Sequence, residues 1–376
     1  MSQSQVTSSD SASASSLTDY LIDRIRREGP ITFHDWMHEA LYNKSAGYYM
    51  RDSARIWGRR GDYRTSPEMS ELFSATFARY VAVLFEELGS PASFHFVECG
   101  AGDGSFAEGM LATLRDCFPA MYEATTYYID EINLNRRRVL GERLGQYSDK
   151  LEFGSLNSLP TLDNGIIFSN ELLDTFPVHR ITKQNGQLIE LYVAVNDRHG
   201  FEWTNGPLSS ERLREIYIAN GIEIDNDQII ELCPHIDDWF AVLAERLLCG
   251  YVVTVDYGFE AGDLYDTTHR PTGTLRAYAR HNFAEVLEQP GERDITAHVN
   301  WTRIRTVGSK LGLETVTFKR QDQFLLDAGI LSELVRKTGS AGSGAEAARL
   351  SVGAREMFFP DGMGSTFQVL VQKKSL

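Results

Sequence analysis

Apolar residues recur at helical spacing in the first quarter of the chain. Leu17, Leu21 and Ile25 share one helical face, and Gly29-Pro30 ends that segment. This spacing predicts helices over residues 17–28, 33–41 and 68–88, with Thr32 as the N-cap of the second helix. A polar loop over residues 47–67 separates the second helix from the third.

After residue 90, short apolar strands alternate with helices. Strands are predicted at residues 94–98, 125–130, 151–153, 166–169 and 251–256, and helices at 106–117, 134–144 and 236–248. This alternation is typical of a parallel sheet covered on both faces. Two late strands, at 313–318 and 367–371, are expected to close the sheet as an antiparallel hairpin. The predicted fold class is therefore α/β, with a Rossmann-like doubly wound sheet.

The same pattern divides the chain. Residues 1–16 are rich in serine and predict a disordered tail, residues 17–90 an N-terminal helical cap, and residues 91–376 the main domain. Two insertions interrupt that domain, at about 178–235 and 258–301. The first is expected to be β-rich, with Asn185-Gly186 as a hairpin turn. The second is long and polar, which is typical of a lid or binding loop.

Composition narrows the classes of function. The chain has 52 acidic and 37 basic residues and a formal net charge of −15, which favours solubility or a cationic partner. We expect no nucleic-acid binding, because no basic stripe with aromatics is visible, and no membrane insertion, because no apolar run is long enough. The four cysteines form no C-x-x-C pair, so we expect neither metal ligation nor a disulfide framework. Together with a start that lacks an Arg-rich presequence, this favours the cytoplasm over the mitochondrial matrix.

A glycine loop follows the first strand of the main domain. Gly100, Gly102 and Gly104 are spaced G-x-G-x-G after the acidic strand end at Glu98. Dinucleotide folds prefer G-x-G-x-x-G, whose third glycine would fall at Ser105. S-adenosylmethionine has no phosphate, so the shorter turn suffices for it. The loop predicts S-adenosylmethionine as the cofactor, bound by Glu98, Gly100, Gly102 and Gly104, and the alternative is a purely structural turn.

The next two strand ends supply further cofactor candidates. Asp130 ends the second strand, where an acidic side chain can accept hydrogen bonds from a ribose diol. The alternatives are a solvated carboxylate, or Glu131 as the ribose contact. Ser155 and Leu156 follow the third strand and are placed by topology to meet the adenine.

The turn after the fourth strand carries the candidate catalytic residues. Asn170 is expected beside the cofactor, and Glu171 and Asp174 beside the methyl acceptor. Methyl transfer needs an acceptor lone pair in line with the C–S bond, so positioning can supply most of the catalysis. Carboxylates could hold an arginine guanidinium bidentately and localise its charge. The alternative is that Asn170 and Glu171 cap a following helix.

Several runs, taken in order, resemble the MidA family. They are Gly29-Pro30-Ile31, Gly47-Tyr48-Tyr49, Gly61–Ser70, Val97–Ser105, Asn170–Val178, Asp256-Tyr257-Gly258, Gly273-Thr274-Leu275, Pro290–Val299, Gln323-Phe324-Leu325 and Met363–Leu370. The resemblance covers roughly residues 17–376. The G-D-x-x-T-S-P-E run from Gly61 and the N-E-x-x-D-x-x-P-V run from Asn170 are its most specific parts.

The resemblance implies a class I methyltransferase that uses S-adenosylmethionine, and mitochondrial members of the family assist respiratory complex I assembly as protein-arginine methyltransferases. It implies an N-terminal cap over the cofactor cleft, with Thr65 and Ser66 at the cofactor, although either residue could simply cap a helix. It implies substrate contacts from the later loops, at Asp256, Tyr257, Asp294 and His298.

The sequence departs from the family pattern near the acceptor loops. Arg64 stands where an apolar residue is usual, Thr175-Phe176 replaces Ala-Leu, Arg276 replaces Gln and Asn300 replaces Asp, while Asp130 replaces Glu and keeps the ribose role. Three functions therefore stay open. The first is methylation of an arginine ω-nitrogen on a protein, such as a respiratory-complex subunit. The second is O- or N-methylation of a small molecule. The third is a role as an assembly factor that binds cofactor with little turnover. The oligomeric state is also open.

Overall fold

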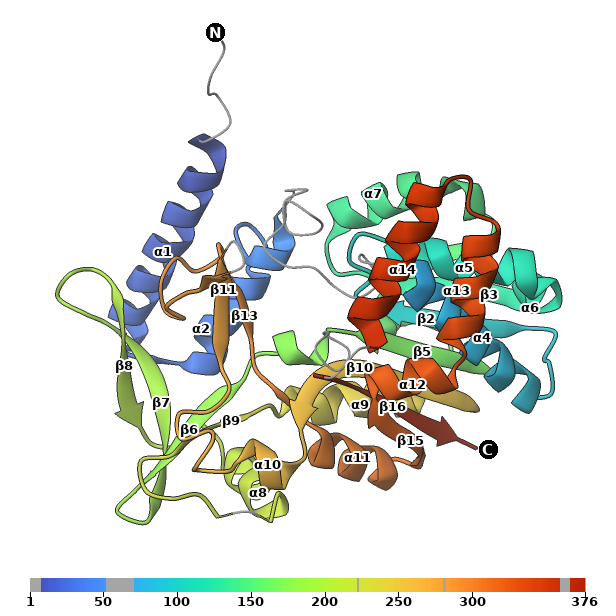
Figure 1. Ribbon diagram of the computed structural model, residues 1–376. Coiled ribbons are helices and arrows are strands. Elements are labelled where there is room, and N and C mark those ends of the chain that lie inside the picture. The colour runs from blue at the N-terminus through green and yellow to red at the C-terminus, as the bar shows by residue number, and fades with distance from the viewer. Residues whose placement is uncertain (1–7, 52–70, 222, 280–281, 359–365, 376) are drawn as a thin grey trace, which may run out of the picture.

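The computed structural model describes residues 8–51, 71–221, 223–279, 282–358 and 366–375. Figure 1 shows two lobes side by side, one built around the main sheet and one that contains the N-terminal helices α1 and α2 with the strands β6–β8. Strand β10 runs from the main sheet toward the second lobe.

The main sheet has the strand order β15-β16-β10-β5-β2-β3-β4. Its strands are β2 (Phe94–Cys99), β3 (Thr125–Asp130), β4 (Leu151–Gly154), β5 (Gly165–Asn170), β10 (Gly250–Phe259), β15 (Leu313–Arg320) and β16 (Phe367–Lys374). Strands β4, β3, β2, β5 and β10 are parallel, whereas β16 runs antiparallel to both β10 and β15. The predicted doubly wound sheet and its closing hairpin are both confirmed.

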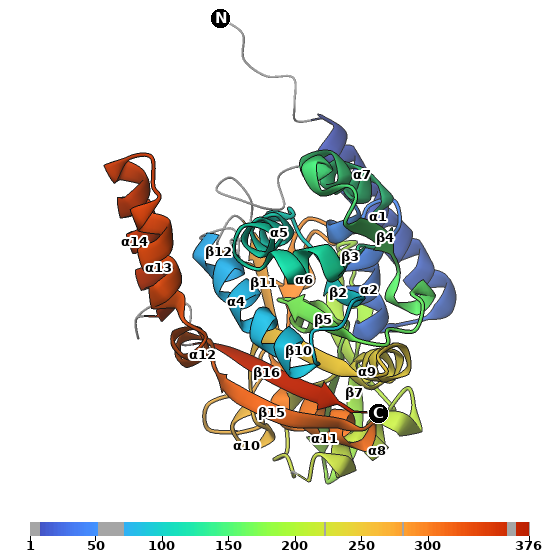
Figure 2. The same cartoon turned by 90° about the vertical axis from the view of Figure 1, so that its right-hand side faces the viewer.

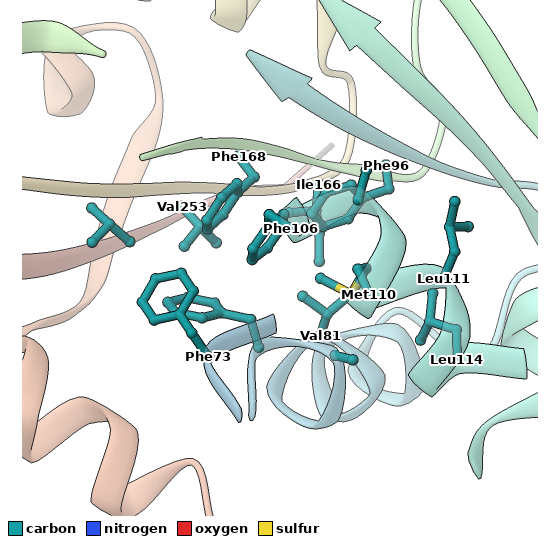
Figure 3. Close-up of a cluster of buried hydrophobic side chains, with 14 of the residues drawn as sticks. Phe73, Val81, Phe96, Phe106, Met110, Leu111, Leu114, Ile166, Phe168 and Val253 are labelled. Atoms are coloured by element: carbon teal, nitrogen blue, oxygen red, sulfur yellow. The ribbon is translucent and has the colours of Figure 1, made fainter. Parts of the chain in front are cut away.

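Helices cover both faces of this sheet. The first face carries α4 (Glu71–Glu87), α5 (Ser105–Cys117), α6 (Pro119–Ala124), α7 (Leu134–Arg143), α12 (Gln321–Asp327), α13 (Ile330–Gly339) and α14 (Gly344–Phe358), and the second face carries α9 (His235–Arg246) and α11 (Trp301–Lys310). In the first layer the rings of Phe106 and Phe168 stack with centroids 4.3 Å apart (Figure 3). This packing fixes α5, and with it the loop that precedes α5, on the sheet. Helices α13 and α14 form a hairpin along one side of the molecule (Figure 2).

The second lobe is built on a five-stranded sheet. Its order is β1-β7-β6-β9, with β8 paired to β7, and its strands are β1 (Ile31–Thr32), β6 (His179–Gln184), β7 (Gln187–Val195), β8 (Phe201–Gly206) and β9 (Ile229–Leu232). The predicted hairpin turn is confirmed, since Asn185 and Gly186 both have positive φ, 50° and 79°. The first insertion is therefore β-rich as expected, with one helix, α8 (Glu211–Ala219).

The structure corrects the expected N-terminal division. Helix α1 begins at Ser8 and runs to Glu28, so residues 8–16 are helical and not part of a disordered tail. Alanine has a high intrinsic helix propensity, which suits this extension. Helices α1 and α2 (Phe33–Tyr42) pack on the insertion, through side chains such as Val178 and Val193. Helix α4 instead belongs to the core of the main sheet, so residues 17–90 are not one cap. Thr32 caps α2 as predicted, accepting the Asp35 N–H at 3.1 Å.

The second insertion is more ordered than the expected polar loop. It contains the end of β10, helix α10 (Ala261–Leu264), the strands β11 (Arg276–Ala279), β12 (Asn282–Phe283) and β13 (Asp294–Thr296), and β14 (Val299–Asn300). Strand β14 lies so close to β10 that a Cβ on Gly258 would be 2.1 Å from the Val299 carbonyl oxygen. Glycine is required there, and it places residues 294–300 beside the end of β10.

Two further properties concern the whole of the described chain. None of its described helices combines the length and apolar character needed to span a bilayer. Cys99, Cys117, Cys233 and Cys249 are all free thiols.

Candidate active site

The glycine loop joins β2 to α5 at the carboxyl edge of the main sheet. Gly100, Gly102 and Gly104 have φ values of 76°, 55° and 84°, which side chains rarely adopt. The Gly100 N–H donates to the Asp130 carbonyl oxygen at 2.9 Å, and a Cβ on Gly104 would lie 2.8 Å from a Leu140 methyl group. The loop therefore needs all three glycines. Gly100 is exposed, so a ligand can approach the backbone there.

An arginine from α7 fixes the outer side of this loop. Arg143 donates to the Asp103 carbonyl oxygen at 2.6 Å and to its carboxylate at 2.9 Å. The same guanidinium bonds Ser105 Oγ at 2.9 Å and Glu108 at 3.0 Å. Asp103 also accepts the Ser105 N–H, at 2.9 Å. These bonds hold the glycine loop in one conformation, so a ligand could bind with little reorganisation of the loop.

Glu98 lies beneath the loop. It is 4% exposed, and its Oε2 accepts the Tyr127 hydroxyl at 2.7 Å. Burial raises the pKa of Glu98 to about 8, so the carboxyl is largely neutral at pH 7. This geometry favours bracing of the strand end over the expected direct contact with the cofactor.

Asp130 and Glu131 have different surroundings. Burial raises the pKa of Asp130 to about 6, although the Leu156 N–H donates to its carboxylate, and Asp130 keeps part of its surface exposed. Glu131 is buried, and its carboxylate accepts the Asn133 N–H at 2.8 Å and lies 3.7 Å from Arg136. Of the two, Asp130 is thus the residue available to a ribose. Ser155 and Leu156 begin the turn after β4, and their contact with the adenine stays a prediction.

The turn after β5 has an unusual backbone. Glu171 has φ of 50°, a conformation that costs a non-glycine residue free energy and clusters at functional sites. Its N–H donates to the Val255 carbonyl oxygen at 2.9 Å, and its Oε1 accepts the Asn170 amide at 3.1 Å. The structure therefore holds Glu171 in a defined position beside β10.

Asp256, not Asn170 or Glu171, caps the next turn. The 3-10 turn η4 (Leu173–Thr175) presents the N–H groups of Leu173 and Asp174 to Asp256 Oδ2, at 2.9 and 3.3 Å. The residue directly before the turn, Leu172, makes no side-chain capping bond, so this geometry favours Asp256 as the cap over the Asn170 and Glu171 alternative. Asp256 has no exposed surface and its pKa is raised to about 7 by burial. It positions the turn, and this geometry does not favour the expected contact with substrate.

Asp174 is a buried member of the same acidic cluster. Burial, followed by the nearby charges of Asp256 and Asp294, holds its pKa well above the usual range, although the Tyr257 hydroxyl bonds to it. The raised pKa favours the protonated form of Asp174. The structure places Asp174 beside Asp256, Tyr257 and Asp294, in surroundings that disfavour a second charged carboxylate next to Asp256.

Two tyrosines from the N-terminal segment, Tyr42 and Tyr49, also reach this cluster. The sequence analysis assigned no role to either and named Tyr49 only within the Gly47-Tyr48-Tyr49 run. The Tyr49 hydroxyl donates to Asp294 Oδ1 at 2.6 Å, and the Tyr42 hydroxyl donates to the Thr175 carbonyl oxygen at 3.1 Å. Their rings stack with centroids 5.6 Å apart. The signal available in the sequence was the aromatic pair Tyr48-Tyr49 directly after a glycine.

His298 borders the acidic cluster. Its ring packs against those of Tyr257 and Phe259, each with centroids 5.3 Å away. Burial lowers the pKa of His298 to about 4, so the imidazole is neutral at pH 7. The His298 N–H donates to Thr274 Oγ1 at 3.0 Å, and Thr274 in turn bonds to the buried Glu231. This chain of bonds fixes the backbone at His298.

Thr65 and Ser66, with the rest of the Gly61–Ser70 run, lie outside the described residues. Within the described ranges, no group of three or more His, Cys, Asp and Glu side chains is arranged to hold a metal ion.

Comparisons with known proteins agree with this arrangement. Residues 76–319 match the family described as "Putative S-adenosyl-L-methionine-dependent methyltransferase". A crystal structure of a COG1565 superfamily member from Burkholderia thailandensis, bound to S-adenosyl-homocysteine, superposes with a TM-score of 0.87 at 26% identity, covering 99% of this chain and 95% of that one.

Curated relatives carry a more specific name. Protein arginine methyltransferase NDUFAF7, mitochondrial, from Xenopus tropicalis is 25% identical over 85% of this chain and 77% of its own length. The human protein of that name is 26% identical over 83% of this chain and 73% of its own length.

Proposed function

Because the chain belongs to the MidA family of S-adenosylmethionine-dependent methyltransferases, we propose that its methyl acceptor is an ω-nitrogen of an arginine on another protein. The observation that carries the proposal is the acidic cluster at the end of β5 and β10, which comprises Glu171, Asp174, Asp256 and Asp294. A cationic acceptor suits such a cluster. The names of the curated relatives support the same substrate class.

The residues around the glycine loop suit S-adenosylmethionine. The exposed backbone at Gly100 allows close approach, and the partly exposed Asp130 can accept hydrogen bonds from a ribose diol. Ser155 and Leu156 are assigned to the adenine, and Asn170 to the methionyl end beside the glycine loop. Bound there, S-adenosylmethionine supplies a methyl group to an in-line nucleophile.

Glu171 is the group proposed to grip the acceptor. Its backbone is held in a strained conformation next to β10, which suits a side chain aimed for function. A carboxylate can bind a guanidinium through two parallel N–H···O bonds and draw positive charge away from the attacking nitrogen. As that nitrogen forms its bond to carbon, it must lose a proton, and Glu171 is placed to accept it.

Asp174 has a different role in this account. A neutral acid can donate one hydrogen bond and accept another, and it adds no charge. We propose that Asp174, with Tyr257, shapes the wall of the acceptor site while Glu171 supplies the charge. His298, which is neutral, adds an aromatic surface with Tyr257 against which a planar guanidinium can stack.

The partner is proposed to be a protein that presents an exposed arginine. Such a cationic group also suits the net charge of −15 of this chain. The four free thiols suit a reducing compartment such as the cytoplasm.

Quantitative mass spectrometry of arginine methylation tests the substrate class in cells. Cells that lack the gene should lose methylation at one or a few arginines, and wild-type protein should restore it. A Glu171→Gln variant produced at the same level should not. An unchanged methylarginine profile in the deleted cells would contradict the proposal and favour a small-molecule acceptor.

A further inference from the structure

Tyr49 joins the two lobes through both its backbone and its side chain. It lies in the short turn η1 (Tyr48–Met50) that follows α2. Its carbonyl oxygen accepts the Asn133 side-chain amide at 3.2 Å, and its hydroxyl donates to Asp294 Oδ1 at 2.6 Å. One residue thus bonds to α7 of the main domain and to β13 of the second insertion.

Asn133 belongs to the cofactor half. It is buried and caps α7, since its Oδ1 accepts the N–H groups of Asn135 and Arg136 at 3.0 and 3.2 Å. Its own N–H donates to Glu131, which directly follows Asp130. Asn133 is therefore held in place by the same short segment that carries the proposed ribose contact.

Asp294 belongs to the acceptor half. It is 6% exposed, and its charge acts on Asp174 in the turn after β5. Burial, followed by the charge of Asp294, holds the pKa of Tyr49 well above its usual range, so the hydroxyl keeps the proton that it donates. Directly after β13, the Ala297 N–H donates to the Asp174 carbonyl oxygen at 2.9 Å. A shift of β13 would therefore move Asp174 or break this bond.

We propose that Tyr49 is a positioning residue that holds β13 and the acceptor site in register with the cofactor site across the two lobes. The proposal rests on the placement of the cofactor at Asp130, but not on the identity of the acceptor. A ligand that orders residues 130–133 should then also restrain the Tyr49 backbone. The Tyr49 hydroxyl should in turn restrain strand β13. This coupling runs through the two hydrogen bonds of Tyr49, so a substitution at Tyr49 can test it.

Hydrogen exchange with S-adenosyl-homocysteine as the probe tests the proposal without any acceptor. In the wild-type protein, ligand should slow exchange at the glycine loop and also at residues 294–297. In Tyr49→Phe, which keeps the ring, calorimetry should show ligand affinity within a few-fold of wild type. The loop should still be protected, but amides of residues 294–297 should exchange roughly tenfold faster or more than in liganded wild type, as loss of a charge-assisted bond implies.

Two further variants separate positioning from general damage. Tyr20→Phe removes a hydroxyl from exposed α1, where it bonds Glu39 at 3.4 Å, and should behave as wild type. Asp294→Asn can still accept from Tyr49 and should keep the protection of residues 294–297. Protection in Tyr49→Phe equal to wild type would overturn the inference, as would wild-type protection confined to the loop and Asp130. Absence of ligand binding in wild-type protein would instead contradict the cofactor site itself.

Discussion

The acceptor site predicts unequal effects for two substitutions in one turn, Glu171→Gln and Asp174→Asn. Each replaces an acid by its amide, with almost the same shape. Asp174 is buried and its pKa is raised, which favours the protonated form, so its amide should change the charge of the site little. Glu171 has a charge that acts on the buried Asp256, so its amide removes charge from the site. The two variants thus serve as matched controls for each other.

The magnitude follows from the bonds that a guanidinium would lose. A hydrogen bond to a charged group contributes about 1.5–3 kcal/mol, and a bidentate grip has two, of which an amide can keep one. Adding the lost charge stabilisation during transfer gives about 3–5 kcal/mol, comparable to removal of one preorganised electrostatic group. At about 1.4 kcal/mol per decade, Glu171→Gln should slow transfer roughly a hundredfold to several thousandfold. Asp174→Asn should slow it by about tenfold or less.

Single-turnover transfer at saturating labelled cofactor is the assay, with lysate proteins from cells lacking the gene as acceptors. Calorimetry should show that both variants bind S-adenosylmethionine as wild type does. Near-normal transfer by Glu171→Gln would refute the carboxylate grip and favour an acceptor that arrives neutral. Equal, large losses in both variants would show that Asp174 is charged or contacts the acceptor directly.

Three other substitutions test the supporting structure. Asp130→Ala should weaken S-adenosylmethionine binding by about 1–3 kcal/mol in calorimetry, and an unchanged affinity would move the ribose contact elsewhere. Glu98 has a folded-state pKa of about 8, above its unfolded value of about 4.3, so wild-type stability should fall as pH rises between these values. Glu98→Gln can still accept the Tyr127 hydroxyl. Without cofactor, its melting temperature should equal that of wild type in acid and exceed it increasingly up to about pH 8. A pH-independent difference in melting temperature would contradict the assigned pKa. Gly258→Ala should cost about 1–3 kcal/mol in denaturant unfolding because its Cβ would overlap Val299, and an unchanged midpoint would mean that β14 can move away freely.

Local patterns were sufficient for the main sheet. The parallel strands are short, mostly apolar runs, and long helices follow β2 and β3. The G-x-G-x-G spacing marks a sharp turn at which a ligand can approach the backbone. The turn at Asn185-Gly186 was equally legible, because both residues tolerate positive φ. These features depend on neighbours in sequence, so one sequence reveals them.

Contacts between distant segments were not visible in the same way. Strand β1 is two residues long and pairs with β7, far along the chain, so no local pattern indicates that α1 and α2 belong with the insertion. Strands β11–β13 are short and polar, without the alternation that marks a half-buried strand. The cap on η4 comes from Asp256 on another strand, whereas neighbours in sequence offered only Asn170 and Glu171 as alternative capping residues.

Transfer of a tritiated methyl group distinguishes an arginine acceptor from other acceptors. Purified protein is incubated with labelled S-adenosylmethionine and a lysate from cells lacking the gene, and the protein fraction is then hydrolysed and its amino acids separated. An arginine acceptor predicts label in ω-methylarginines, formed by wild-type protein and largely lost with Glu171→Gln. Label found in small molecules, or in protein amino acids other than arginine, would contradict it.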